Sequence, residues 1–197
     1  MATYKGIQGF SIQNLSEDPV PTVAGWSAGG NLSSVRSGLG GAGIQTAALA
    51  FGGNPGPTAA TEEYDGSTWT SVNSMNTARI LLGSAGTQTA ALGFGGYAPG
   101  NTTATESYNG STWTSVNSLN TARYGMGGAG TTAAAFAAGG GVPNVTSVED
   151  WDGTNWTAGT SLGTAKRVMA SAGTQTAGLI AGGFSTAVLS DTEEYNG

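Results

Sequence analysis

Short apolar runs alternate with short polar runs and glycines along most of this chain. Residues 79–122 show the pattern best: RILLGSAG (79–86) and TQTAALGFGG (87–96) are followed by TATESYNG (103–110) and STWTSVNS (111–118). Thr, Tyr, Trp and Val favour strands, and the apolar run at 90–94 is too short between its glycines for a helix. We therefore predict four short strands, the second of them buried on both faces.

The third and fourth runs are joined by a turn signal, Asn109-Gly110. Equivalent Asn-Gly or Asp-Gly pairs stand at 65–66, 152–153 and 196–197. Such pairs favour a two-residue type I′ hairpin turn, because both central residues of that turn need a positive φ. Each unit is thus expected to be a four-stranded antiparallel meander.

The whole unit repeats. Residues 61–79 (TEEYDGSTWTSVNSMNTAR) and 105–123 (TESYNGSTWTSVNSLNTAR) differ at three positions, and a looser copy spans 148–166. One tryptophan marks each repeat at steps of 43, 44 and 43 residues: Trp26, Trp69, Trp113 and Trp156. Four strands repeated at about 40–50 residues are typical of a propeller blade. We predict an all-β, four-bladed β-propeller over residues 24–197, preceded by an extension at 1–23.

The repeat also predicts how the propeller closes. Blades are expected at 36–78, 79–122, 123–165 and 166–197, and the last of these lacks a fourth strand. Residues 25–32 lie one repeat before the strand of Trp69, so we expect them to complete the last blade. The alternative is that this strand completes the blade of another chain, which gives a fibre or a larger ring. Closure within one chain is favoured because tethering raises the local concentration of the strand.

Three further positions recur in every unit. The first holds a strand aromatic, which we expect to pack between blades together with the tryptophans: Tyr64, Tyr108, Trp151 and Tyr195. The second holds a carboxylate: Glu62, Glu106, Glu149 and Glu193. The third holds a cation: Arg36, Arg79, Arg123 and Lys166. A ring of carboxylates is a candidate Ca²⁺ site and a ring of cations a candidate anion site, but we expect each carboxylate to pair with a neighbouring cation, repeated because the unit repeats.

Composition narrows the function. Charged residues make up 9% of the chain, the net charge is −6, and no basic run is present, so we expect no nucleic-acid partner. The chain has no histidine and no cysteine, which removes the commonest general base and the thiolate ligands. Adjacent carboxylates such as Glu62 and Glu63 point to opposite faces of a strand. We expect no enzyme activity, no cofactor, no export signal and no membrane span.

Loops between the second and third strands vary most between units: 54–60, 97–104, 141–147 and 184–191. All four are expected on one face, where variable loops on a rigid scaffold carry binding. The candidate binding residues are Asn54, Tyr97, Asn101, Asn144 and Phe184. Tyr97 is a candidate to stack on a sugar ring.

The order of the repeated residues resembles the kelch family. A double glycine is followed by the strand aromatic and then by the tryptophan, with the glycine pairs at 52–53, 95–96, 139–140 and 182–183. The resemblance covers about residues 24–197 and implies a propeller, although kelch propellers usually have six or seven blades and this chain has material for four.

A second resemblance covers the leader as well. YKGI (4–7), QN (13–14) and SEDP (16–19), with YNGSTWT (108–114), resemble short structural proteins from tailed phages of marine bacteria. It implies a virion fibre, appendage or decoration protein that is assembled in the host cytoplasm. Residues 1–23 would then bind other virion proteins, the loops would meet a host-surface glycan or protein, and a homo-oligomer is expected. The alternatives are a bacterial lectin or adhesin and, less favoured, a propeller-scaffold enzyme.

Overall fold

The computed structural model describes residues 25–197, which form fifteen strands and no helix. Blade 1 comprises β1 (Gly40–Ile44), β2 (Ala47–Phe51), β3 (Thr61–Tyr64) and β4 (Trp69–Val72). Blade 2 comprises β5 (Gly83–Gly86), β6 (Ala91–Phe94), β7 (Thr105–Tyr108) and β8 (Trp113–Val116). Blade 3 comprises β9 (Gly127–Gly130), β10 (Ala135–Ala138), β11 (Val148–Trp151) and β12 (Trp156–Ala158). Blade 4 comprises β13 (Ala170–Thr174), β14 (Ala177–Phe184) and β15 (Val188–Tyr195).

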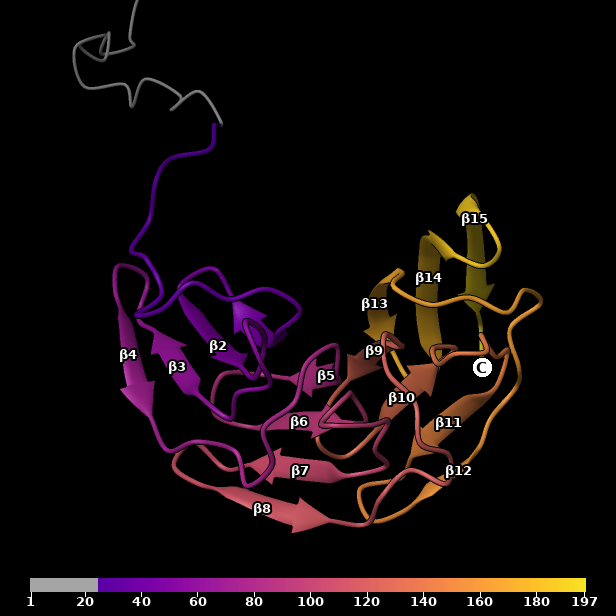
Figure 1. Cartoon of the computed structure of the whole chain (residues 1–197), viewed down its shortest axis with the longest axis horizontal. Helices are drawn as coiled ribbons and strands as arrows, with labels where there is room; N and C mark the ends of the chain where they lie inside the picture. The colour runs from indigo at the N-terminus through magenta and orange to yellow at the C-terminus, as the bar shows by residue number, and fades with distance from the viewer. Residues whose placement is uncertain (1–24) are drawn as a thin grey trace, which may run out of the picture.

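Within each blade the strands pair in chain order and run antiparallel. Figure 1 shows the four sheets following one another around a common centre, with β1, β5, β9 and β13 on the inside. Strand β1 packs beside β5, β5 beside β9, and β9 beside β13. The predicted all-β architecture of four propeller blades is therefore confirmed.

Small residues on the inner strands let the sheets approach closely. A Cβ atom added to Gly128 of β9 would lie 2.5 Å from the ring of Phe94 in the preceding blade, which is far inside van der Waals contact. All four residues of β6 and of β10 are buried. In blades 2 and 3 the apolar runs predicted as doubly buried strands thus form the middle of the core, and the glycine-rich inner strands make room for their side chains. In blade 4 the prediction is wrong, because β14 lies beside the open end of the arc and Leu179 is exposed.

Backbone hydrogen bonds join each blade to the next at one repeat position. The N–H of Leu81 donates to the carbonyl of Gly38 (2.7 Å), that of Gly125 to Leu81 (2.7 Å), and that of Val168 to Gly125 (2.6 Å). All four residues have a left-handed backbone, with φ between 52° and 64°. Leu81 and Val168 adopt it at a steric cost, which the hydrogen bonds between blades offset.

The predicted type I′ turns are wrong. Four residues separate β7 from β8, and only Gly110 of the Asn109-Gly110 pair has a positive φ. The Asn109 side-chain oxygen accepts hydrogen bonds from the N–H groups of Ser111 (3.0 Å) and Thr112 (2.9 Å). Asn and Asp side chains organise longer turns in this way, and the N–H donors at the equivalent Asp65 hold the pKa of that carboxyl far below its ordinary value.

The predicted closure by residues 25–32 is also wrong within the structure described. Blade 4 has three strands, and residues 25–32 form no strand beside β15. Trp26 is fully exposed, and residues 25–30 lie beside Tyr64 and Ser67 of blade 1. The reason is geometric: blades 1 and 4 are not packed together, so the arc in Figure 1 is open between them. The predicted attachment segment at 1–23 lies outside the described residues.

Candidate functional site

A buried ion pair ties each of the first three blades to the segment that precedes it. In blade 2, Arg79 Nη2 lies 2.9 Å from Glu106 Oε1, and both side chains are buried. Arg79 Nη1 donates to the carbonyls of Gly95 (2.9 Å) and Ala104 (2.7 Å). Glu106 Oε2 accepts the N–H of Asn76 at 2.6 Å. Burial lowers the pKa of Arg79, and the charge of Glu106 opposes that shift.

The same pair recurs as Arg36–Glu62 and Arg123–Glu149, as expected for a repeated structural unit. In blade 4, Lys166 Nζ instead contacts Asp191 (2.6 Å) and Glu193 (2.8 Å), whose side chains are 38% and 25% exposed. Each repeated carboxylate is thus held by a cation of its own blade. Within residues 25–197, no three acidic, His or Cys side chains gather as a metal site requires.

A hydrogen bond between blades 1 and 2 should make stability depend on alkaline pH. The Tyr108 hydroxyl donates to Glu63 Oε1 (2.9 Å), and burial together with this carboxylate raises the pKa of Tyr108 to about 12. Because unfolded tyrosine titrates near pH 10, the Tyr108 hydroxyl contributes its full share of stability below pH 10. That share is lost as the pH rises through about 12. We expect a loss on the order of 2 kcal/mol, measured by urea unfolding at successive pH values.

The matched variant for this pH effect is Tyr108→Phe. It keeps the ring and removes the titrating hydroxyl, so its unfolding free energy should fall less steeply above pH 10. Equal slopes for the two proteins would contradict the role of this hydroxyl.

The four variable loops share one face, because all of them connect second to third strands of equivalent antiparallel sheets. Beneath each loop, the residue after the double glycine meets the residue after the repeated cation. Three of these contacts are isolated β-bridges, Ser37↔Asn54, Ile80↔Tyr97 and Arg167↔Phe184, and in the fourth the N–H of Gly141 donates to the carbonyl of Tyr124 (2.7 Å). We call these eight residues the loop-face pairs; their side chains differ in every blade.

An aromatic pair lies between blades 2 and 3 on this face. The rings of Tyr97 and Tyr124 meet edge to face with centroids 5.9 Å apart, and Tyr97 is 40% exposed. Asn101 forms a bridge with Tyr97 across the loop. Tyr97 is therefore accessible to solvent, and the structure places Tyr124 beside it.

A polar cluster spans blades 3 and 4 on the same face. Asn144 Nδ2 donates to the carbonyls of Phe184 (3.0 Å) and Ser185 (3.1 Å). Arg167 Nη1 donates to Asn144 Oδ1 (3.1 Å), and its guanidinium lies 4.9 Å from the centre of the Phe184 ring. The structure therefore brings Asn144 and Phe184 together, whereas Asn54 accepts a hydrogen bond from Gly56 within its own loop.

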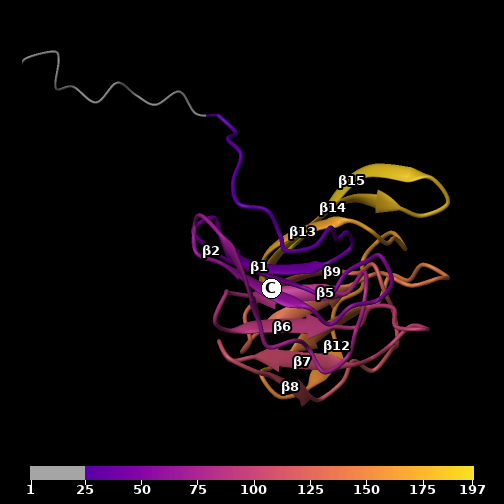
Figure 2. The ribbon, with the colours of Figure 1, turned by 60° about the vertical axis from the view of Figure 1, so that its left-hand side comes forward.

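Sequence reasoning missed Tyr124 and Arg167, which precede inner strands and are far from the loops in sequence. The available signal was that the residue after the repeated cation differs in every blade: Ser37, Ile80, Tyr124 and Arg167. The loop predicted at 184–191 is largely strand, since β14 reaches Phe184 and β15 begins at Val188. In Figure 2 this hairpin projects beyond the other blades.

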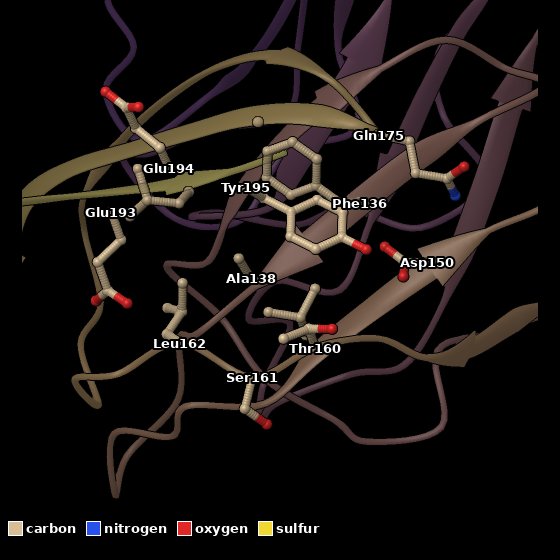
Figure 3. Close-up of a pocket in the computed structure, with 13 residues that line it drawn as sticks. Phe136, Ala138, Asp150, Thr160, Ser161, Leu162, Gln175, Glu193, Glu194 and Tyr195 are labelled. Carbon is tan, nitrogen blue, oxygen red and sulfur yellow. The ribbon is translucent and has the colours of Figure 1, made fainter. Parts of the chain in front are cut away.

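A pocket with a cavity volume of about 110 Å³ lies between blades 3 and 4. Figure 3 shows Phe136 and Ala138 of β10 facing Tyr195 of β15, whose hydroxyl points toward Asp150 of β11. Burial raises the pKa of Asp150. The lining also includes Val148, Leu162, Gly178 and Ile180. The apolar walls indicate an apolar occupant, and sequence reasoning did not foresee this pocket.

No model of a known protein family matches the chain, and a search of curated proteins finds no similar sequence. The described residues contain no helix able to cross a membrane.

Proposed function

We propose that this chain is a non-enzymatic structural and adhesive component of a phage virion, built from divergent kelch-type repeats. The observation that carries the proposal is the contrast between the scaffold and the loop face. Buried ion pairs repeat in the first three blades, while the loop-face pairs differ in all four. A rigid frame that presents variable side chains on one face is the arrangement that binding proteins use.

The chemistry of the loop face favours a glycan or a protein surface as ligand. Tyr97 and Tyr124 offer aromatic surface, and Arg167 with Asn144 offers polar groups about one blade further around the arc. Aromatic rings with nearby hydrogen-bonding side chains suit sugar rings and peptide surfaces alike. This combination supports adhesion to a host surface.

The virion context is supported by the leader, whose YKGI, QN and SEDP elements resemble those of structural proteins of tailed marine phages. In the proposed arrangement residues 1–23 attach the chain to other virion proteins. The propeller then projects its loop face outward. Assembly occurs in the host cytoplasm, and the particle leaves by lysis.

The first test is particle composition. Mass spectrometry and antibody labelling of purified phage particles from the source of this gene should detect the full chain, and particles that lack it should adsorb poorly. Absence from purified particles would overturn the virion role.

The second test addresses the loop face. Labelled full-length protein should bind host cells, and Tyr97→Ala combined with Arg167→Ala should weaken that binding about tenfold or more, since exposed aromatic and Arg side chains carry much of the energy of such contacts. Thr112→Ala in the turn after Asn109, which is not among the variable loops, is the matched control. Equal loss in both variants would argue against the loop face.

A bacterial lectin or adhesin is the second candidate, and the Tyr97–Tyr124 pair, in which Tyr97 is exposed, favours it. Binding on a glycan array that depends on Tyr97, without any association with phage particles, would select it over the virion role.

A further inference from the structure

Two tryptophans fill equivalent sockets between neighbouring blades. Trp113 of blade 2 packs against Phe51 of blade 1 (ring centroids 4.8 Å apart), and its Nε1 donates to Thr61 Oγ1 at 3.1 Å. Trp156 of blade 3 does the same with Phe94 (4.9 Å) and Thr105 (3.0 Å) of blade 2. Each socket is therefore built by one blade and filled by the fourth strand of the next.

The pocket between blades 3 and 4 is the third socket of this series. In the first socket, the buried cluster around Trp113 includes Leu49, Phe51, Met75, Ala91 and Tyr108. Strand register and the repeat place their counterparts, in the same order, at Phe136, Ala138, Leu162, Gly178 and Tyr195. All five counterparts line the pocket, and so does Val148, the counterpart of Thr61. No residue that the structure describes occupies the position of the tryptophan.

The outer edge of blade 4 is unfilled in the same way. Strand β15 pairs with β14 alone among the described strands, whereas β3, β7 and β11 each have a fourth strand beside them. Tyr195 is thus a strand aromatic whose cross-strand tryptophan is missing. Its equivalents pair in register as Tyr64↔Trp69, Tyr108↔Trp113 and Trp151↔Trp156.

Residues 25–36 have the features of a fourth strand and its connector. Trp26 stands at the tryptophan position of the repeat and is fully exposed. Ser33 N–H donates to Glu62 Oε2 (2.8 Å), as Asn76 and Asn120 donate to Glu106 and Glu149 in the following blades. In those two cases the connector leaves a strand that belongs to the preceding blade. The segment at 25–28 is therefore placed to enter a blade packed ahead of blade 1.

Other groups at the two ends of the arc match as well. The hydrogen bonds that run through Gly38, Leu81, Gly125 and Val168 leave the Gly38 N–H and the Val168 carbonyl without a backbone partner among the described residues. Gln88 and Gln175 each donate to two carbonyls of the preceding blade, while the equivalent Gln45 is exposed. Blade 1 therefore offers hydrogen-bond donors, the Gly38 N–H and the Gln45 side chain, and blade 4 offers the Val168 carbonyl as an acceptor.

We infer that a second copy of this chain fills the pocket, with its residues 25–28 added to β15 and its Trp26 inserted between blades 3 and 4. Blade 1 of the second copy then packs against blade 4 of the first, and its Gly38 N–H meets the Val168 carbonyl. Residues 25–28 of the same chain do not fill this pocket, because Ser33 holds the segment that follows them on blade 1. Blade 1 is separated from blade 4 by the opening of the arc. The contact is head to tail, so it forms a ring or a filament.

Light scattering after size-exclusion chromatography tests the assembly on the full chain. The wild-type protein should form a dimer or larger species, and Trp26→Ala should weaken self-association about tenfold or more, as expected for loss of a buried interface tryptophan. Trp26 is exposed in the single chain, so its removal should leave the circular dichroism unchanged. Tyr97→Ala, an exposed aromatic on the loop face, is the control and should assemble normally. A monomeric wild-type protein would overturn the inference.

Cysteine pairs separate insertion between chains from closure within one. By the register of the other blades, Ser27 should lie opposite Glu194, as Thr70 lies opposite Glu63, and the chain has no cysteine of its own. A mixture of Ser27→Cys protein with Glu194→Cys protein should form a disulfide-linked heterodimer under mild oxidation, because cross-strand partners lie within disulfide reach. Ser27→Cys mixed with Asn109→Cys should not. A disulfide within single chains of the double variant, without the heterodimer, would show intramolecular closure and refute the proposal.

Discussion

Trp113→Ala should lower the free energy of unfolding by about 3–5 kcal/mol, the usual cost of truncating a buried tryptophan. The indole fills the socket between blades 1 and 2, against Phe51 and Tyr108, and donates a hydrogen bond to Thr61. The variant loses that packing and leaves a cavity at the junction of two sheets. Urea unfolding followed by tryptophan fluorescence and circular dichroism measures the loss.

The chain contains a matched control for this substitution. Trp69 occupies the same repeat position in blade 1, where no described blade precedes it, and it is partly exposed with Tyr64 as its aromatic neighbour. Trp69→Ala should therefore cost about 1 kcal/mol at a protein concentration where the chain is monomeric. Equal losses at the two positions would mean that the socket between blades contributes little to stability.

Arg79→Met should lower the free energy of unfolding by about 3–5 kcal/mol, as Trp113→Ala does, because it leaves Glu106 as an uncompensated buried charge. Glu106 would keep its hydrogen bonds from the N–H groups of Asn76 and Thr77 but lose the guanidinium. The carbonyls of Gly95 and Ala104 would also lose their donor. The measurement is again the unfolding free energy in urea.

Two comparisons make this result specific. Adding Glu106→Gln to Arg79→Met removes the orphaned charge and keeps an acceptor for Asn76, so part of the stability should return. Arg167→Met makes the same change at a half-buried arginine on the loop face and should cost about 1 kcal/mol or less. If Arg79→Met were as mild as Arg167→Met, the buried pair would not be needed to hold the connector on its blade.

The roles of Trp113 and Arg79 explain why the side chains of the loop face can vary. The tryptophan sockets hold blade to blade, and the buried pairs hold connector to blade, so neither depends on the loops. Tyr97, Tyr124, Asn144 and Arg167 are therefore free to change with the surface that the protein meets. Under the proposed function, adhesion evolves on the loops while the frame stays constant.

Most of the candidate site depended on contacts that sequence does not reveal. Tyr97, Asn144 and Phe184 were predicted because they lie in loops that differ between repeats. Tyr124 and Arg167 join them only because each first strand begins on the face where the second strand ends. The pocket beside Tyr195 likewise requires knowing that a fourth strand is missing from the described blade.

The sequence by itself determined the repeating unit, the strand order within each blade and the burial of the second strands in blades 2 and 3. The physical reason is that these features depend on local alternation, on glycine positions and on a period that one blade imposes on the next. It also indicated that each repeated carboxylate pairs with a neighbouring cation, since a buried charge requires a partner, whereas the structure showed that the partner of Glu106 is Arg79.

Only the tertiary structure decided whether the first and last blades meet. The curvature of the arc is set by how closely neighbouring sheets pack, which depends on side chains such as Phe94 of blade 2 against Gly128 of blade 3 rather than on the number of strands. With four blades the arc stays open. Trp26 therefore remains outside the core of its own chain, although its place in the repeat is the same as that of Trp113.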